Sequence, residues 1–496
     1  MRLLAILFGA LVVAAPCIAR ADDAASLLAK HRTYTGWRFD DPAIGRQDVT
    51  ETVTEADGTP RQEIHTLRVG AIYRSDTHDL KENATYSRGF TGRVFWYADL
   101  NGFTVPIIGD PAKVALAQDM FFTDGVGELP WTVTGTQHKW NADYTVVRVK
   151  QDSSAPIDLY VDPATGAYAG ATLDPGGPHE RTLHVLAYED LPGGKRVISK
   201  WQVDGSKRTT TVTKISTSAT VTNDDLHPPA PTASWQFVNP QPFPIVLTKT
   251  RIIVKAKING VEGRFLLDSG AADIFISGGF ARRAGLKPIG HSVAYSLYGS
   301  QKTDVGIASS IDVGGNTLNN VTLYFGQRDF DDSAPDGLLG FGFLAGAFIT
   351  IDFEHSTMQV QDPSSVDVAN AAGVHIAVDL NSGQPVTPMS VQQKTVTVNA
   401  MLDTGSPRVI LIDKRLVFDY GLHMTAAGVL GGCGLLDNMT LGPIVYDHPN
   451  ACLVDYSTDL HSALLGYDFL KGLSKLEFDY GRAGMILVPR ANTAKN

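Results

Sequence analysis

The stretch FLLDSGAADIFIS, residues 265–277, is an apolar run that ends in an acid, a small hydroxyl residue and a glycine before apolar residues return. Nearly the same phrase, AMLDTGSPRVILID, stands at residues 400–413. An apolar run of this length is typical of a buried strand, so in both places an acid ends a strand that lies in the core. A carboxylate in such a position is costly unless a partner compensates it. The duplication indicates where that partner comes from.

Further landmarks show that the C-terminal half is an internal repeat. Each phrase is followed by a helical pattern (FARRAGL or RLVFDYGL), a glycine-rich middle, a Leu-Leu-Gly and a final strand pair. The two acids lie 135 positions apart, the two Leu-Leu-Gly motifs 126, and the final strands, compared at Ile351 and Leu476, 125. Because the landmarks keep their order, we expect two copies of one fold, the second about ten residues shorter in its middle.

The residues that follow each acid have separate tasks. Gly270 and Gly405 are expected to allow a tight turn with unusual backbone angles. Ser269 and Thr404 carry hydroxyls that can donate or accept across an interface between the copies. A single D-[ST]-G is weak evidence, because the same residues are common in ordinary turns and helix caps. Two copies in matching surroundings favour a chemical role.

Two acids brought together by symmetry can share one proton. Like charges about 3 Å apart resist double ionisation, so one pKa rises and the other stays low. Asp268 and Asp403 would then supply a general acid and a general base in one site. Such a pair can activate water for attack on a peptide carbonyl, and this chemistry needs no metal or cofactor.

This constellation resembles the retropepsin-like aspartic proteases, the group that contains retroviral proteases and pepsin, over residues 243–489. In that family each subunit has one D-[ST]-G loop and a later apolar-apolar-Gly beside it, here ending in Gly340 and Gly466. The resemblance implies two tandem retropepsin-like β-barrel repeats that form a single-chain, pepsin-like pseudodimer and act on a polypeptide. It implies that Asp268 and Asp403 are the catalytic dyad and that the two hydroxyls form a bridge beneath them.

The two copies differ next to the turn. Ala271 follows the first turn, whereas Ser406 follows the second. A hydroxyl there could donate to the Asp403 carboxylate and favour its ionised form, which predicts that Asp268 holds the proton.

The family also covers its site with flap hairpins, for which the glycine-rich middles are the candidates. In the first copy, Tyr298 beside Gly299 is a candidate flap tip, although an ordinary strand tyrosine is the preferred interpretation. In the second copy, Cys433 lies in the glycine-rich middle, and a disulfide with Cys452 would tie that hairpin to a following strand. Two buried thiols are the alternative interpretation of these cysteines.

Composition limits the other functions. The 496 residues are 43% hydrophobic and 19% charged with a net charge of −10, which fits a globular protein and does not favour nucleic-acid binding. Residues 1–21 have the pattern of a cleavable signal peptide, so we expect a periplasmic or secreted protein. No later segment approaches the roughly 18 apolar residues of a membrane span. The histidines and cysteines show no metal-binding spacing.

The rest of the chain divides at a proline-rich stretch. Residues 22–226 contain short strand patterns at regular spacing, with one helix candidate at 110–122, and predict an antiparallel sheet or half-barrel. Six prolines crowd residues 228–244, so residues 227–242 are predicted to be a linker. The repeats are then assigned to residues 243–362 and 374–489. The chain is expected to be a monomer.

Three functions remain open. The preferred one is an exported aspartic endopeptidase. The second is an inactive binding or scaffold protein that keeps the protease fold. The third follows from the N-terminal β-rich part, which is faintly similar to periplasmic lipoprotein carriers through the stretch IDLYVDPATGAYAGATL, residues 157–173, and which would then bind a lipid or acyl ligand. A deep apolar cavity under that sheet would favour the third function, and a filled core would not.

Overall fold

A computed structural model of the chain describes residues 21–36, 46–177, 179–217, 220–296, 299–326, 334–392, 396–408, 410–418, 421–425, 432–455 and 462–490. The predicted signal peptide lies outside these residues except for Ala21, where the first helix begins. The chain is mainly β, as expected. Within the described part, no helix is both long and apolar enough to cross a membrane.

The N-terminal half is one antiparallel sheet of thirteen strands in the order β6-β5-β4-β3-β2-β1-β13-β12-β11-β10-β9-β8-β7. Nearly every strand pairs with its neighbour in sequence, as the regular turn signals predicted. The strands are β1 (Arg46–Thr54), β2 (Pro60–Val69), β3 (Ile72–Asp79), β4 (Ala84–Phe90), β5 (Phe95–Ala98), β6 (Thr104–Ile107), β7 (Trp131–Lys139), β8 (Ala142–Val149), β9 (Ile157–Val161), β10 (Tyr168–Leu173), β11 (Arg181–Leu191), β12 (Lys195–Val203) and β13 (Thr209–Ser216).

Two helices cover one face of this sheet. The helix predicted at 110–122 is confirmed as α2 (Gly109–Phe122), and it connects β6 and β7, the two edges of the sheet. A second helix, α1 (Ala21–Thr35), precedes the first strand of the sheet. Leu27 of α1 and Phe121 of α2 pack with buried residues of β7 to β11, such as Leu159, in one hydrophobic core. The face beneath the helices is therefore filled by side chains.

The first repeat forms most of a nine-stranded sheet with the order β14-β22-β19-β23-β18-β17-β21-β20, in which β16 also pairs with β17. Its elements are β14 (Ser234–Gln236), β15 (Phe243–Pro244), β16 (Val246–Leu247), β17 (Ile252–Ile258), β18 (Val261–Leu267), β19 (Phe275–Ile276), α3 (Gly278–Arg283), β20 (Gly290–Ser296), β21 (Gly299–Val313), β22 (Asn316–Gly326), β23 (Gly337–Leu339), α4 (Phe341–Leu344), β24 (Phe348–Asp352) and β25 (Thr357–Gln361).

The second repeat forms an eight-stranded sheet with the order β30-β33-β29-β34-β28-β27-β31-β32. Its elements are β26 (Val374–Ala377), β27 (Val386–Val391), β28 (Val396–Asp403), β29 (Ile410–Asp413), α5 (Lys414–Phe418), β30 (Cys433–Leu435), β31 (Asn438–Leu441), β32 (Ile444–Asp447), β33 (Asn450–Val454), β34 (Ala463–Gly466), α6 (Tyr467–Leu470), β35 (Leu473–Asp479) and β36 (Gly484–Pro489).

The repeats meet in a third sheet, with the order β15-β25-β24-β35-β36-β26, to which each contributes three strands. In its centre β24 pairs antiparallel with β35, and Ile351 stands opposite Leu476. These are the same two residues that the sequence repeat aligns. An antiparallel pair in which equivalent residues face each other has a local twofold axis between them, so this sheet lies on the pseudo-twofold axis of the two repeats.

The stretch predicted to be a linker is partly built into the first repeat. Residues 234–236 form β14, which pairs antiparallel with β22, and Ala233 is fully buried. The strand fits here because the chain between Pro231 and Pro240 contains no proline. Residues 234–236 of the predicted linker therefore belong to the sheet of the first repeat.

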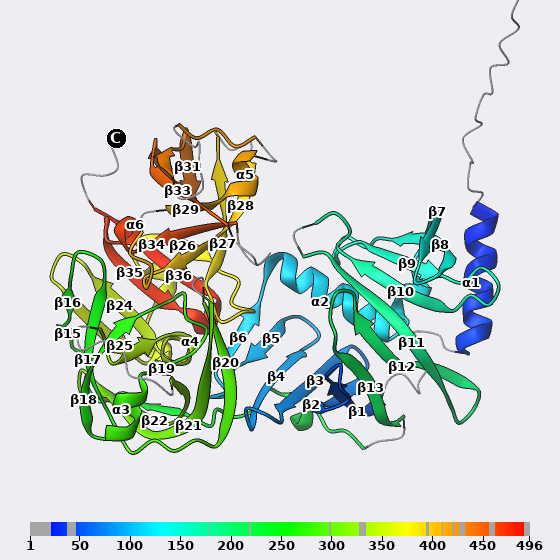
Figure 1. Cartoon of the computed structure of the whole chain (residues 1–496), viewed down its shortest axis with the longest axis horizontal. Coiled ribbons are helices and arrows are strands. Elements are labelled where there is room, and N and C mark those ends of the chain that lie inside the picture. Colours follow the sequence, from blue (N-terminus) through cyan, green and yellow to red (C-terminus); the bar gives the residue numbers. More distant parts are fainter. Residues whose placement is uncertain are drawn as a thin grey trace, which may run out of the picture.

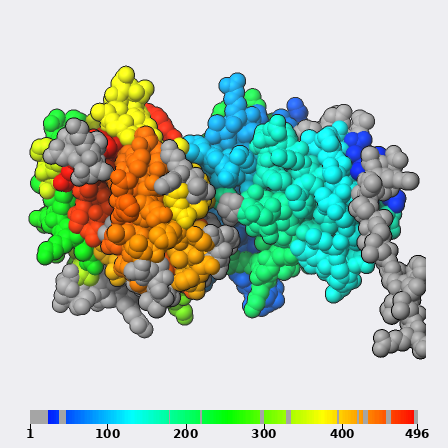
Figure 2. All heavy atoms as spheres, turned by 90° about the horizontal axis from the view of Figure 1, so that it is seen from above, coloured from blue at the N-terminus to red at the C-terminus, as the bar shows by residue number. Residues whose placement is uncertain are grey.

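The two halves of the molecule lie side by side, with β5 and β6 next to the C-terminal half (Figure 1, Figure 2). The start of β6 enters that half, because Phe103, just before this strand, and Val105 within it belong to its hydrophobic core. The Asn101 side chain exchanges two hydrogen bonds with the backbone of Thr322, at 2.7 Å and 3.2 Å. The N-terminal sheet and the first repeat thus share a packed interface.

Candidate active site

Each acid stands at the end of a strand that runs parallel to the strand of its Leu-Leu-Gly motif. Asp268 follows β18, which runs parallel to β23, and its N–H donates to the carbonyl of Leu339 at 3.0 Å. Asp403 ends β28, which runs parallel to β34, and stands opposite Gly466. After each acid the chain returns as β19 or β29, which pair antiparallel with β23 or β34. The two D-[ST]-G phrases and the two Leu-Leu-Gly motifs therefore lie together in pairs.

The glycines of the Leu-Leu-Gly motifs are required by close backbone contacts. A Cβ atom at Gly340 would collide with the carbonyl oxygens of Asp273 and Ala271. A Cβ atom at Gly466 would collide with the carbonyl oxygen of Arg408. Each motif therefore passes directly against the loop that presents its acid, and no side chain fits between them.

The two hydroxyls bridge the repeats. Ser269 Oγ donates to the carbonyl of Leu402 at 2.7 Å and accepts from the Thr404 N–H at 3.0 Å. Thr404 Oγ1 donates to the carbonyl of Leu267 at 2.8 Å and accepts from the Ser269 N–H at 3.0 Å. Both side chains are fully buried. These four reciprocal bonds fix the two loops against each other.

Glycine is required at positions 270 and 405 for a different reason from the one expected. Neither Gly270 nor Gly405 has a positive φ, so unusual backbone angles do not explain them. A Cβ atom at Gly270 would instead lie 2.5 Å from Cγ of Asp403, and one at Gly405 would collide with Cγ of Asp268. Each acid therefore lies against the glycine of the opposite loop, and only glycine leaves room for it.

Burial and proximity separate the acidities of the two carboxyls. Burial, the charge of Asp403 and a hydrogen bond with it raise the pKa of Asp268 well above its ordinary value. Burial also raises the pKa of Asp403, but N–H donors and the hydrogen bond from Asp268 oppose this shift. Asp403 Oδ1 accepts from Gly405 N at 2.8 Å and Ser406 N at 3.1 Å. These shifts favour the proton on Asp268 and the charge on Asp403.

The sequence argument expected the same direction, but from a different donor. The donor from Ser406 is the backbone N–H, and the hydroxyl that was expected to act makes no such bond to Asp403. The equivalent N–H of Ala271 donates to the backbone carbonyl of Asp268 at 3.2 Å and also lowers the pKa of the Asp268 carboxyl. Both loops therefore present backbone donors to their acids, and the charge of Asp403 is the further cause that raises the pKa of Asp268.

The first predicted flap is a hairpin of β20 and β21, in which Ser296 pairs with Gly299. Tyr298 lies outside the described residues, so its proposed role at a flap tip stays a prediction. Most of the second candidate flap also lies outside them, between residues 426 and 431.

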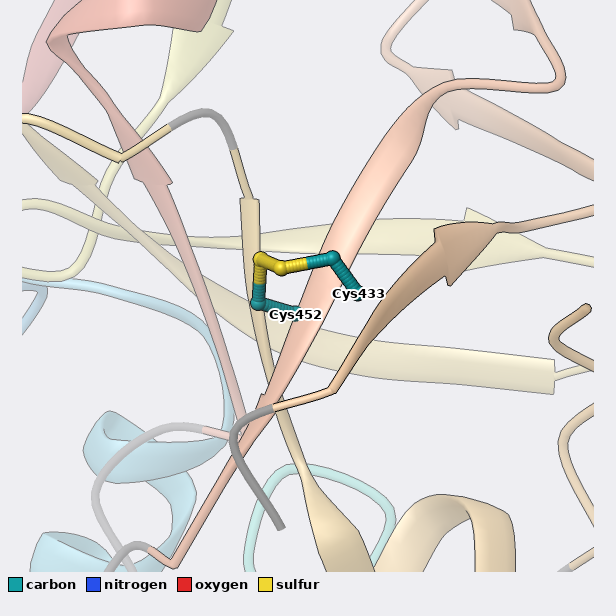
Figure 3. Close-up of a disulfide and its surroundings, with 2 residues drawn as sticks. All are labelled: Cys433 and Cys452. Carbon is teal, nitrogen blue, oxygen red and sulfur yellow. A yellow bond between two sulfur atoms is a disulfide. The ribbon is translucent and has the colours of Figure 1, made fainter. Parts of the chain in front are cut away.

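The two cysteines of the second repeat form a disulfide. Cys433 in β30 and Cys452 in β33 stand opposite each other in an antiparallel pair and are bonded through their sulfur atoms (Figure 3). The bond ties the strand after the glycine-rich middle to a following strand, as the sequence analysis expected of a disulfide here. The alternative of two free thiols is wrong.

Two residues near the dyad were missed by the sequence analysis. Tyr480 is fully buried, and burial together with the charges of Asp403 and Asp268 raises the pKa of its hydroxyl well above the ordinary value. That hydroxyl has no hydrogen-bond partner among the described residues. Gln384 Nε2 donates to the carbonyl of Gly270 at 2.6 Å and adds a contact between the repeats. No local pattern marks either residue, because both contacts join distant segments.

Two hollows lie in the described part of the N-terminal domain. A pocket lined by residues such as Phe121, Tyr168 and Tyr188 has a volume of about 40 Å³, room for a water or two. A larger hollow of about 540 Å³ lies against the exposed side of α1 and is lined mainly by small and polar residues, including Ser26 and Lys30. Neither hollow is a deep apolar cavity, so neither favours lipid carriage.

Comparison with known proteins agrees with the fold of the C-terminal half. Residues 254–343 match the sequence model of the Aspartyl protease family, and this segment is therefore an aspartyl protease domain. The match contains Asp268 and the first Leu-Leu-Gly and does not reach the second repeat. No curated protein sequence matches the chain.

Three solved structures resemble parts of the chain. An aspartic proteinase from Irpex lacteus is 11% identical, with 53% of this chain and 99% of that chain covered and a TM-score of 0.36. A retropepsin-like aspartic protease from Rickettsia conorii is 19% identical over 23% of this chain and 79% of that chain, with a TM-score of 0.17. A putative outer membrane lipoprotein-sorting protein domain from Vibrio parahaemolyticus is 9% identical over 42% of this chain and 97% of that chain, with a TM-score of 0.30.

Proposed function

We propose that the protein is an aspartic endopeptidase whose dyad is formed by Asp268 and Asp403, one from each repeat. The observation that carries this proposal is that each acid lies against the glycine of the opposite loop, above reciprocal hydroxyl bonds between the loops. Only a geometry that brings two carboxyls together needs glycine at both places. A polypeptide is the substrate that the family of the first repeat implies.

The proposed reaction uses the different protonation of the two acids. Ionised Asp403 takes a proton from a water molecule, whose oxygen bonds to the carbonyl carbon of the peptide. Protonated Asp268 gives its proton to the carbonyl oxygen and so stabilises the tetrahedral intermediate. The C–N bond then breaks, the proton held by Asp403 passes to the leaving amine, and Asp268 recovers its proton from the intermediate. The residues of the chain supply every proton transfer.

The alternative of an inactive scaffold is less well supported. A protein that kept only the fold would have no need for two buried acids, whose burial raises both pKa values and weakens folding at neutral pH. We also propose that the protein is exported. The pattern of residues 1–21 supports this, and the disulfide between Cys433 and Cys452 suits an oxidising compartment.

The test is cleavage of an unfolded protein substrate by the chain from Asp22 onward, between about pH 3 and 7, beside Asp268→Asn and Asp403→Asn. We expect the wild type to cleave and each variant to lose at least about a thousandfold in kcat while circular dichroism shows it folded. Equal inactivity of all three proteins would refute the proposal. Activity that survives in either variant would show that the two acids do not act as one pair.

A further inference from the structure

The N-terminal domain touches the hairpin of β20 and β21 through the turn between β3 and β4, residues 80–83. The N–H of His291 in β20 donates to the carbonyl of Lys81 in this turn at 2.8 Å. A Cβ atom at Gly290, the first residue of β20, would collide with the carbonyl oxygen of Glu82. The turn therefore lies in direct backbone contact with the base of the hairpin.

The Glu82 carboxylate is the centre of this contact. Its Oε1 accepts from Ser292 Oγ in β20 at 2.5 Å, and its Oε2 accepts from the Tyr324 hydroxyl in β22 at 2.9 Å. Arg61 Nη2 of the N-terminal domain lies 3.5 Å from Oε1. The side chain is 14% exposed. Hydrogen bonds to an ionised acceptor are stronger than neutral ones, and little water competes here.

Tyr324 extends the contact towards the dyad. Its N–H donates to the carbonyl of Ile274 at 2.9 Å, and it pairs in parallel with Phe275 of β19. This strand is the return of the chain after the loop that presents Asp268. One carboxylate of the N-terminal domain is thus bonded to the hairpin strand and to the strand that supports an acid of the dyad.

The turn that carries Glu82 is itself fixed. Asp79 Oδ1 accepts from the N–H groups of Lys81 and Glu82, at 3.0 Å and 2.9 Å. Arg61 pairs with Asp79 at 2.8 Å, and the Asp79 side chain is almost fully buried. A carboxylate on a turn held in this way loses little conformational freedom when it forms its contacts, so it can hold other elements in place.

We propose that Glu82 is a positioning residue for the protease site. Its carboxylate fixes the β20–β21 hairpin against β22 and, through Tyr324, steadies the strand behind the Asp268 loop. The proposal rests on the proteolytic function proposed above and adds that the N-terminal domain takes part in shaping the site. It assigns no contact with substrate to Glu82.

The first test is hydrogen exchange of the full chain from Asp22 onward, which needs no activity. In Glu82→Ala, we expect the amides of β20 and the start of β21 to exchange at least about tenfold faster, because the anchoring bonds to a charged group are lost. The central strands β24 and β35 should be unchanged. Glu63→Ala is the matched control, because Glu63 is an exposed acid of the same domain on β2.

Two milder variants keep the test decisive where Glu82→Ala does not fold. Tyr324→Phe and Ser292→Ala each remove one hydroxyl from the carboxylate, and each should speed exchange in β20 by a smaller factor. Glu82→Gln keeps an acceptor oxygen and should recover part of the protection. Exchange in β20 that stays at the wild-type rate in Glu82→Ala, or in both hydroxyl variants, would overturn the proposal.

Kinetics separate this proposal from the proteolytic function itself. With an active wild type, we expect Glu82→Ala to raise KM about tenfold and to change kcat by less than about threefold, because the hairpin is the candidate flap over the substrate and the acids stay intact. Unchanged kinetics despite faster exchange would overturn the positioning role. An inactive wild type would refute the proposed function, while the exchange result would still decide whether Glu82 holds the hairpin.

Discussion

Removing one hydroxyl from the bridge between the repeats should weaken the C-terminal half measurably. Thr404→Val keeps the size and shape of the side chain but has no oxygen. The Thr404 hydroxyl donates to the Leu267 carbonyl at 2.8 Å and accepts from the Ser269 N–H at 3.0 Å, and all three residues are fully buried. Valine therefore removes two hydrogen bonds and leaves a buried N–H without its acceptor.

The size of the effect follows from these contacts. A hydrogen bond contributes about 1 kcal/mol net, and a buried donor left without an acceptor costs about 1–3 kcal/mol. We expect Thr404→Val to lower the free energy of unfolding by about 2–4 kcal/mol. The matched control is Thr404→Ser, which keeps the oxygen and loses one methyl group, for a cost of about 1 kcal/mol.

The assay is urea unfolding of the full chain, followed by circular dichroism, with the midpoint and slope compared between variants. The reasoning requires Thr404→Val to be the less stable of the two. Equal stability of the valine and serine variants would refute it, because the bridge would then contribute nothing beyond its volume.

Three further changes test the electrostatics of the site and its surroundings. Ser406→Ala keeps the backbone N–H that donates to Asp403, so the acidic limb of the pH–rate profile should not move; a shift would show that the hydroxyl acts after all. Burial raises the pKa of Asp99 to about 7. The protonated Asp99 carboxyl therefore contributes fully to the stability of the folded protein below about pH 4, and this contribution is lost as the pH rises towards 7. The stability of Asp99→Asn relative to wild type should therefore rise by up to about 4 kcal/mol between pH 4 and pH 8 in urea unfolding, and a difference that does not vary with pH would contradict the shift. Tyr480→Phe removes a buried hydroxyl without a partner among the described residues, so thermal unfolding should show equal or higher stability; a loss above about 1 kcal/mol would reveal a bond that the structure does not show.

Contacts between the N-terminal sheet and the first repeat join the N-terminal domain to the C-terminal half. Phe103 packs into the core of the C-terminal half, and Asn101 bonds to the backbone of Thr322. With the Glu82 contacts, these interactions join the N-terminal sheet to the first repeat at two places. A chain cut near residue 226 would expose the apolar surface that Phe103 covers and would leave the hairpin base without its carboxylate.

The sequence by itself determined the repeat, the position of the acids and much of the strand order. Apolar runs ending in D-[ST]-G predicted β18 and β28, and the spacing of 125 positions between Ile351 and Leu476 matches the pair that lies on the pseudo-twofold axis. These features are local or periodic, so one chain without a structure is enough to find them.

Only the tertiary structure decided how the parts act on each other. Gly270 is glycine because Asp403 of the other repeat occupies the space of a side chain, and not because its own turn needs a positive φ. The charge of Asp403 is stabilised by a backbone N–H of Ser406, whose direction depends on the path of the loop. Glu82 meets Tyr324 across 242 positions of sequence. Such contacts leave no periodic trace in the chain, because they arise only when separate elements pack together.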